Sequence, residues 1–185
     1  AGKDVEGKAE AYISEFLYDG IPYGGMVAVL EKTGKDISAE ATIDNEMANA
    51  TLEGNGYLDG AESWLNLLAD VRYFHPYRLG FLKKYPDYTL SGKLSAQLAG
   101  DNIDNVTGEA RLTDVEFFAP ESKSLSLDRL LLTSSIDGDI RKITLRSDWV
   151  DGDLSGTFKV KDLPSAVRNM LSSAVPCILP PVSRK

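Results

Sequence analysis

The sequence has few of the residues that most enzymes and metal sites depend on. Its 185 residues include one cysteine, Cys177, and one histidine, His75. A single cysteine excludes an internal disulfide framework and any zinc site built on several thiolates, and a single histidine excludes a two-histidine metal site. A Ser-His-Asp or Cys-His arrangement would have to use His75, for which packing or hydrogen bonding is the simpler role. We therefore expect no cofactor.

Positive charge and long hydrophobic runs are also scarce. Lys and Arg together number 20 against 28 for Asp and Glu, so the formal net charge is -8. Such a surface repels phosphate backbones, and a nucleic-acid partner is therefore not expected. Apolar runs are only a few residues long, whereas about 20 are needed to span a bilayer. The chain also lacks the glycine-rich phosphate-binding motifs and the nucleophile-elbow motif.

Alternation with a period of two residues is the dominant pattern. It is clearest over residues 37–43 and 154–160, where every second residue is apolar or small. The same alternation runs over residues 110–117 with a kink between Leu112 and Val115. This pattern is typical of antiparallel strands with one buried face. The sequence therefore predicts a mainly β fold.

Asp-Gly pairs separate several of these runs. They lie at residues 19–20, 59–60, 137–138 and 151–152. Asp-Gly suits a type I′ turn, in which both central residues have positive φ, so most of these pairs predict hairpins. The pair at 59–60 is expected to lead into a helix instead.

The chain resembles itself at an offset of about 100 residues. An offset of 101 gives five identities in the twelve positions 5–16, and an offset of 102 places Leu52 on Leu154. Two nine-residue segments, 61–69 and 163–171, share the apolar spacing of an amphipathic helix. The stripes are Ala61, Leu65, Leu68 and Ala69 in the first segment, and Leu163, Val167, Met170 and Leu171 in the second. These patterns predict two tandem copies of a sheet-plus-helix unit, at residues 1–72 and 90–185.

The connector between the copies, residues 73–89, is rich in aromatic residues. They are Tyr73, Phe74, Tyr77, Phe81, Tyr85 and Tyr88. Rings at this density could stack on sugars or lie at a membrane interface. The simpler interpretation is that they pack where a helix crosses the sheet.

Carboxylates gather near two of the Asp-Gly pairs. They are Asp137, Asp139, Asp148, Asp151 and Asp153. A calcium site needs six to eight oxygen ligands, and Asp-x-x-Asp-Gly-Asp offers only part of that set. Aspartate also accumulates in turns without binding anything, which is the simpler interpretation. A hydrolase that uses two of these carboxylates stays open, because such pairs have no fixed spacing.

Residues 143–167 resemble repeats of the TamB-like branch of the AsmA-like envelope proteins. The resemblance rests on a strand ending near Ser147, a turn, a strand carrying Leu154-x-Gly156-x-Phe158, and a helix opening at Asp162. It covers residues 90–171 and, more faintly, residues 5–70. It implies a curled or taco-like antiparallel sheet with an apolar groove for phospholipid acyl chains, and no catalytic residue.

The resemblance also implies a cellular setting. Members of the family are long periplasmic proteins that an N-terminal helix anchors in the inner membrane of bacteria with two membranes. They act in phospholipid transport and outer-membrane assembly, and TamB partners an outer-membrane barrel of the Omp85 class. The present sequence has no such helix and both its ends look cut, so we expect an interior or C-terminal-side segment of a longer chain.

A set of apolar strand residues is expected to line the groove. They are Ala110, Leu112, Leu125, Leu127, Leu145, Leu154, Phe158 and Val160. The same residues would also fill a closed core. Two other functions stay open at this point, a β-rich adhesion or carbohydrate-binding module and the hydrolase considered above.

Overall fold

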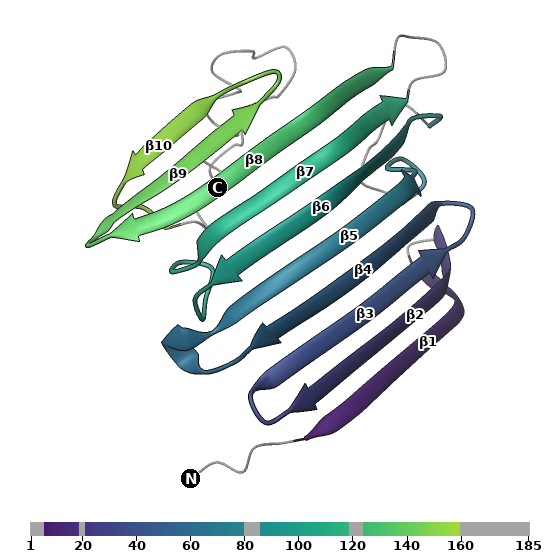
Figure 1. Cartoon of the computed structure of the whole chain (residues 1–185). Helices are drawn as coiled ribbons and strands as arrows, with labels where there is room; N and C mark the ends of the chain where they lie inside the picture. The colour runs from purple at the N-terminus through teal and green to yellow at the C-terminus, as the bar shows by residue number, and fades with distance from the viewer. Residues whose placement is uncertain (1–5, 19–20, 80–85, 119–123, 160–185) are drawn as a thin grey trace, which may run out of the picture.

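The computed structural model describes residues 6–18, 21–79, 86–118 and 124–159. Within these residues the chain forms one antiparallel sheet of ten strands (Figure 1). The strands are β1 (Gly7–Tyr18), β2 (Ile21–Thr33), β3 (Asp36–Asp44), β4 (Ala48–Tyr57), β5 (Trp64–Phe74), β6 (Thr89–Ala99), β7 (Thr107–Phe118), β8 (Leu125–Asp137), β9 (Ile140–Ser147) and β10 (Gly152–Gly156). The predicted mainly β, antiparallel fold is confirmed.

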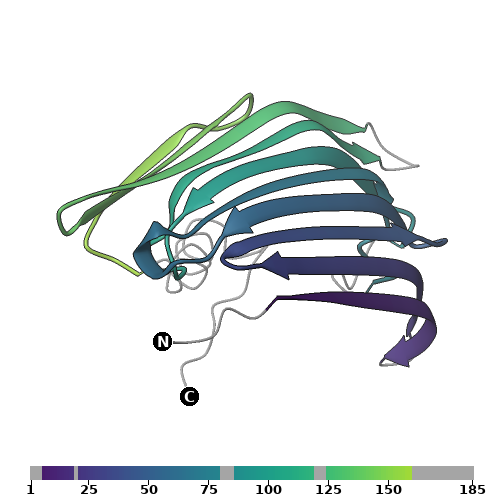
Figure 2. The same cartoon turned by 60° about the horizontal axis from the view of Figure 1, so that its bottom comes forward.

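The strands lie in the order in which they follow one another along the chain. Each strand pairs with the next, so β1 and β10 form the two edges and the sheet is not closed. Figure 2 shows that the sheet curls across its strand order. β5 pairs with β6, so the sheet is continuous between the segments on either side of the connector. Two tandem copies are not shown by this arrangement and stay a prediction.

The prediction of a helix over residues 61–69 is wrong. A single 3-10 turn, η1 (Gly60–Glu62), follows Asp59, and β5 then begins at Trp64. Leu65 and Ala69 satisfy a period of two as well as a helical period, and β4 and β6 provide backbone partners on both sides. Strand pairing therefore overrides the local helical spacing. The segment 163–171 lies outside the described residues.

The Asp-Gly pairs behave differently from one another. The pair at 137–138 does lie at a hairpin, but Asp137 pairs with Ile140, so the central turn residues are Gly138 and Asp139. Gly138 has a φ of 57° and Asp139 is not among the positive-φ residues. A glycine at the first central position is the requirement of type II′ rather than type I′. The pair at 151–152 opens β10, and the pair at 19–20 lies outside the described residues.

The predicted kink between Leu112 and Val115 is a β-bulge. The register of β6 with β7 shifts between Ser91 and Lys93, and Asp114 has a φ of 53°. Ser91 pairs with Glu116 and Lys93 with Thr113, so Gly92 of β6 faces two residues of β7, and this extra residue restores the alternation. A Cβ added at Gly92 would lie 3.1 Å from the side chain of Val115, which places Val115 beside Gly92. Residues 110–112 and 115–117 therefore keep their apolar side chains on one face.

Buried hydrophobic side chains are few in the described part of the chain. They are Met47, Ala48, Leu79, Ala96 and Leu127. Met47, Ala48 and Leu79 form a small cluster with Ile43 and Phe74 at one end of β3, β4 and β5. A single layer of strands buries few apolar side chains, and among the described residues this corner holds the cluster of them.

Asn45 fixes the turn beside that cluster. Its Oδ1 accepts hydrogen bonds from the backbone N–H groups of Met47, at 2.8 Å, and Ala48, at 3.0 Å. Its Nδ2 donates to the carbonyl of Gly24 at 2.6 Å. The hydroxyl of Tyr73 donates to the backbone carbonyl of Asn45 at 2.5 Å. Through its side chain and its backbone carbonyl, Asn45 thus joins β2, the β3–β4 turn and β5.

Candidate functional site

One face of the sheet is lined almost entirely by small and apolar side chains. Because directly paired residues of neighbouring strands point to the same face, the register traces each row across the sheet. One complete row from β1 to β10 consists of Ala9, Leu30, Ala39, Gly54, Leu67, Ala96, Ala110, Leu132, Leu145 and Gly152. The next row begins Ala11, Ala28, Ala41, Leu52, Ala69, Leu94, Leu112 and Leu130. We call this surface the apolar face.

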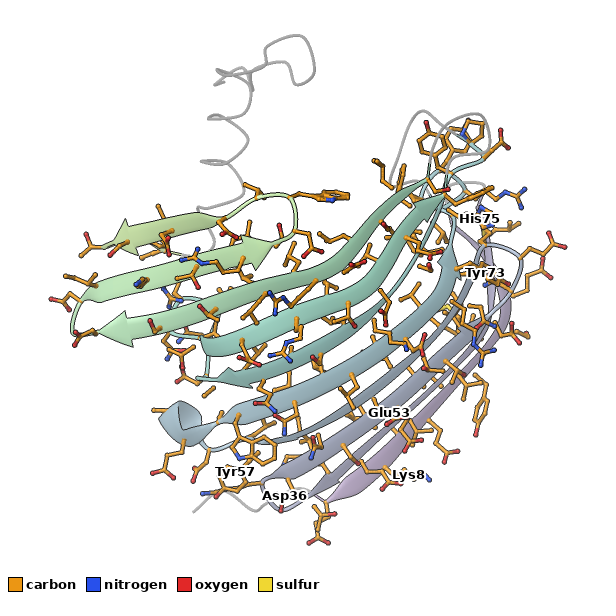
Figure 3. The ribbon with its side chains drawn as sticks, turned by 45° about the horizontal axis from the view of Figure 1, so that its top comes forward. Lys8, Asp36, Glu53, Tyr57, Tyr73 and His75 are labelled. Carbon is orange, nitrogen blue, oxygen red and sulfur yellow. The ribbon has the colours of Figure 1, made fainter. Side chains whose placement is uncertain are left out.

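The opposite surface, the polar face, has the reverse composition. Its central row consists of Lys8, Glu31, Ser38, Asn55, Asn66, Gln97, Glu109, Thr133, Thr144 and Asp153. Figure 3 labels four residues of this face, Lys8, Asp36, Glu53 and Tyr57, among the side chains that project from the ribbon. The two faces therefore divide the sequence into an oily surface and a hydrated one.

Several exposed ion pairs lie on the polar face. Lys8 Nζ lies 2.9 Å from a carboxylate oxygen of Glu10 and 3.2 Å from one of Glu31, and both contacts raise the pKa of the lysine. Arg146 contacts both carboxylate oxygens of Asp153 at 2.9 Å, which raises the pKa of the guanidinium. These pairs are exposed, so each contributes little to stability and serves mainly to keep this face hydrated.

On β3 and β5 the apolar face is better shielded from solvent than the polar face. On β3, Ile37, Ala39, Ala41 and Ile43 are half-buried while the polar residues between them are exposed. On β5 the apolar-face residues Leu67 and Ala69 are likewise half-buried, and the intervening Leu68 is 56% exposed. This difference is expected when the apolar face lines the inner surface of a curved sheet, where neighbouring side chains converge.

A hollow of about 200 Å³ lies on the apolar face near β1–β5. Nearly all its lining atoms are carbon, and small side chains form much of its floor. It is bordered by Ala11, Ile13, Met26, Val27, Ala28, Ala41, Thr42, Ile43, Ala50, Thr51, Leu52 and Ala69. Alanines on three successive strands leave room that leucines would fill, which is why the surface is hollowed here.

The apolar face ends at a polar cluster around Arg141 on β9. The Arg141 side chain is almost fully buried, and its guanidinium donates to the Ser134 hydroxyl at 2.8 Å and to the carbonyls of Val106 and Asp104, at 2.8 and 2.6 Å. These acceptors hold the loop before β7 against β8 and β9. The cluster is a structural boundary of the oily surface, because its donors are already engaged.

Six of the eight predicted groove residues share the apolar face. Ala110, Leu112 and Leu145 belong to the rows traced above, and Leu154 pairs with Ile143 in the row between β9 and β10. Leu125 and Leu127 pair with Phe117 and Val115 beyond the bulge.

The other two predicted residues are not on the strands that form this face in the described part of the chain. Phe158 follows the end of β10, so the predicted strand over 154–160 stops at Gly156, and Val160 is outside the described residues.

The residues that line the hollow were not among the predicted set. Met26, Ala28, Ala41 and Leu52 come from the N-terminal half of the chain, whereas all eight predicted residues come from the C-terminal half. The alternation over residues 37–43 already indicated that Ile37, Ala39, Ala41 and Ile43 share one face of β3. Which neighbouring alanines come together depends on the strand register, which the sequence alone does not give.

The aromatic connector makes contacts within the fold. Phe74 packs on the corner cluster, and the ring of Tyr88 meets that of Phe117 edge-on with centroids 4.9 Å apart. His75 donates its backbone N–H to the Met47 carbonyl at 2.8 Å, and burial followed by the charge of Arg78 lowers the pKa of its imidazole. Tyr77 is exposed, and Phe81 and Tyr85 lie outside the described residues. These contacts favour the packing interpretation of the rings over a ligand platform.

The aspartates of the β9–β10 region act in turns and an ion pair. Asp148 Oδ2 accepts from the Arg129 backbone N–H at 2.9 Å, and Asp151 Oδ1 accepts from that of Ser147 at 3.1 Å. Asp153 is bound by Arg146. Across the described ranges, no group of three or more His, Cys, Asp or Glu side chains is placed to hold a metal ion.

Comparisons with known proteins give no match: none to a protein-family model, none to a curated protein and none to a solved structure. In the part of the chain that the structure describes, no helix has the length and apolar character needed to cross a membrane.

Proposed function

We propose that this chain is a non-enzymatic segment of a bacterial envelope protein and that its apolar face accommodates the acyl chains of phospholipids. The observation that carries the proposal is the apolar face itself, which continues over all ten strands while only five hydrophobic residues of the described chain are buried. Contiguous apolar surface on this scale is unusual unless something covers it. An acyl chain has the length and chemistry to do so.

The energetics favour a carrier surface over a tight binding pocket. Each methylene removed from water contributes about 0.8 kcal/mol, so ten methylenes contribute roughly 8 kcal/mol before the costs of association. The rows of the apolar face repeat the same chemistry from strand to strand, and the hollow beside β3 offers almost no polar atom to fix a ligand in one place. A uniform oily track lets a lipid move along it without a deep trap.

The cellular setting belongs to the proposal as well. The resemblance to TamB-like proteins supports a periplasmic location, an inner-membrane anchor elsewhere in the full-length protein, and an outer-membrane barrel as partner. Its support is the sequence pattern around residues 143–167 alone. The open antiparallel sheet with one oily face is compatible with this setting.

Native mass spectrometry of the chain purified from bacteria under mild extraction tests the proposal. We expect co-purifying phospholipid on the unmodified chain. Ala41→Glu introduces a carboxylate into the hollow between Ala28 and Leu52, and because an acyl chain cannot solvate that charge, bound lipid should fall at least about tenfold. On the same strand, Ser38→Glu places the same charge on the polar face, away from the hollow, and should leave the bound lipid unchanged.

Absence of lipid from the unmodified chain would contradict the proposal. Equal loss of lipid in the Ala41 and Ser38 variants would do the same, since it would show that binding does not depend on the apolar face. Circular dichroism of both variants separates loss of binding from loss of the sheet.

A further inference from the structure

The polar face carries a row of uncharged amide side chains across three adjacent strands. Asn55 of β4 pairs with Asn66 of β5, which pairs with Gln97 of β6. None of the three side chains makes a hydrogen bond or ion pair with another described residue, and Asn55 and Gln97 are exposed. The charged side chains elsewhere in the same row are paired, as in Lys8 with Glu31, Glu109 with Arg111 and Asp153 with Arg146. Unused amides are therefore concentrated on β4–β6.

An indole ring and two hollows adjoin this row. Trp64, one pleat away from Asn66 on β5, is 38% exposed. A hollow of about 310 Å³ is bordered by Trp64, Asn66 and Gln97, and a second of about 280 Å³ by Asn55, Asn66 and Glu53. Asn66 borders both, so the two hollows meet at the middle of the amide row.

From this arrangement we infer a second binding site, for a neutral polysaccharide strand lying across β4, β5 and β6. A side-chain amide offers two donors and an acceptor, which is what the hydroxyl and acetamido groups of sugars need. An indole face packs on the C–H-rich face of a pyranose ring. Amides on successive strands are about 4.8 Å apart, so they form a ladder along which an extended chain can bind.

The charges around the ladder select among polymers. Glu40 and Glu53 border the hollow beside Asn55, and Glu109 lies next to Gln97 in the row. These carboxylates repel nucleic acids and sulfated or uronic glycans, while they accept hydrogen bonds from neutral sugar hydroxyls. The site is on the opposite face from the proposed lipid track, so either can be wrong without the other.

Tryptophan fluorescence reports directly on this site. The chain has two tryptophans, and Trp149→Phe, a change at a turn residue 61% exposed, leaves Trp64 as the sole reporter. In that background, cellohexaose or chitohexaose should produce a saturable change in emission. Asn55→Ala, Asn66→Ala and Gln97→Ala combined should weaken binding at least about tenfold, since three hydrogen-bonding groups are lost. A control with Ser126→Ala, Ser135→Ala and Ser155→Ala changes three other exposed strand residues and should bind as before.

Three outcomes would overturn the inference. They are the absence of saturation by either hexasaccharide up to about 10 mM, equal weakening by the serine control, and binding of a heparin hexasaccharide as tight as that of the neutral sugars. The last outcome would indicate a site selected by charge rather than by amides. Circular dichroism of each variant checks that the sheet is retained.

Discussion

The two faces of the sheet are built on the same ten strands but differ in how their side chains interact with water. The polar face carries exposed ion pairs and other hydrated polar groups, so it needs no cover. The apolar face presents small and apolar side chains from every strand, and among the described residues Ala96 and Leu127 are the buried hydrophobic ones outside the corner cluster. Across the described residues, the comparison shows one hydrated surface and one apolar surface whose buried hydrophobic residues gather mainly at one corner.

The largest expected difference is between a buried leucine of the apolar face and an exposed leucine of the polar face. Leu127 is 7% exposed, so Leu127→Ala should lower the free energy of unfolding by about 3 kcal/mol through lost burial and the cavity left behind. Leu68 is 56% exposed on the polar face, and Leu68→Ala should cost less than about 1 kcal/mol. Urea denaturation of both variants measures the difference. Comparable losses would mean that the two faces are covered to the same extent in solution.

The corner cluster can be tested through the residue that holds its turn. Asn45→Ala removes the acceptor of two backbone N–H groups and a donor to Gly24, and should lower the free energy of unfolding by about 2 kcal/mol. Asn49→Ala removes one exposed hydrogen bond to Asp44 and should cost less than about 0.5 kcal/mol. The same denaturation assay applies. If Asn45→Ala were as mild as Asn49→Ala, the corner would not be what anchors the apolar face.

The features of the sheet that depend on residues close together in sequence could be predicted from the sequence. The period-two alternation predicted the strands, the shared face of Ala110 and Leu112, and the irregularity before Val115. It failed at residues 61–69, because the spacing of Leu65 and Ala69 fits a helix and a strand equally and the deciding partners are on β4 and β6. The hollow escaped prediction for the same reason. Ala11, Ala28 and Ala41 are far apart in sequence, and only the register brings them together.

A smaller effect compares two glycines in neighbouring hairpins. Gly138 has a φ of 57° and no atom within 4 Å of an added Cβ, so Gly138→Ala should cost about 1 kcal/mol from backbone conformation alone. Gly152 has equal space and an ordinary φ, and Gly152→Ala should be neutral or slightly stabilising. Thermal unfolding of the two variants isolates the contribution of the turn. A neutral Gly138→Ala would show that the β8–β9 turn can adopt another conformation at little cost.

The smallest expected effect is a pH dependence from His75 at the end of β5. Burial, followed by the positive charge of Arg78, lowers the pKa of this imidazole in the folded chain. The unfolded chain therefore binds the proton more readily, so the contribution of neutral His75 to stability is present above the unfolded pKa of about 6.5 and is lost as the pH falls through the lower folded pKa. We expect the urea midpoint of the unmodified chain to decline slightly more than that of His75→Gln between pH 7 and pH 5. Parallel declines would place His75 in solvent, and a steeper decline for His75→Gln would mean that the folded chain favours the protonated imidazole.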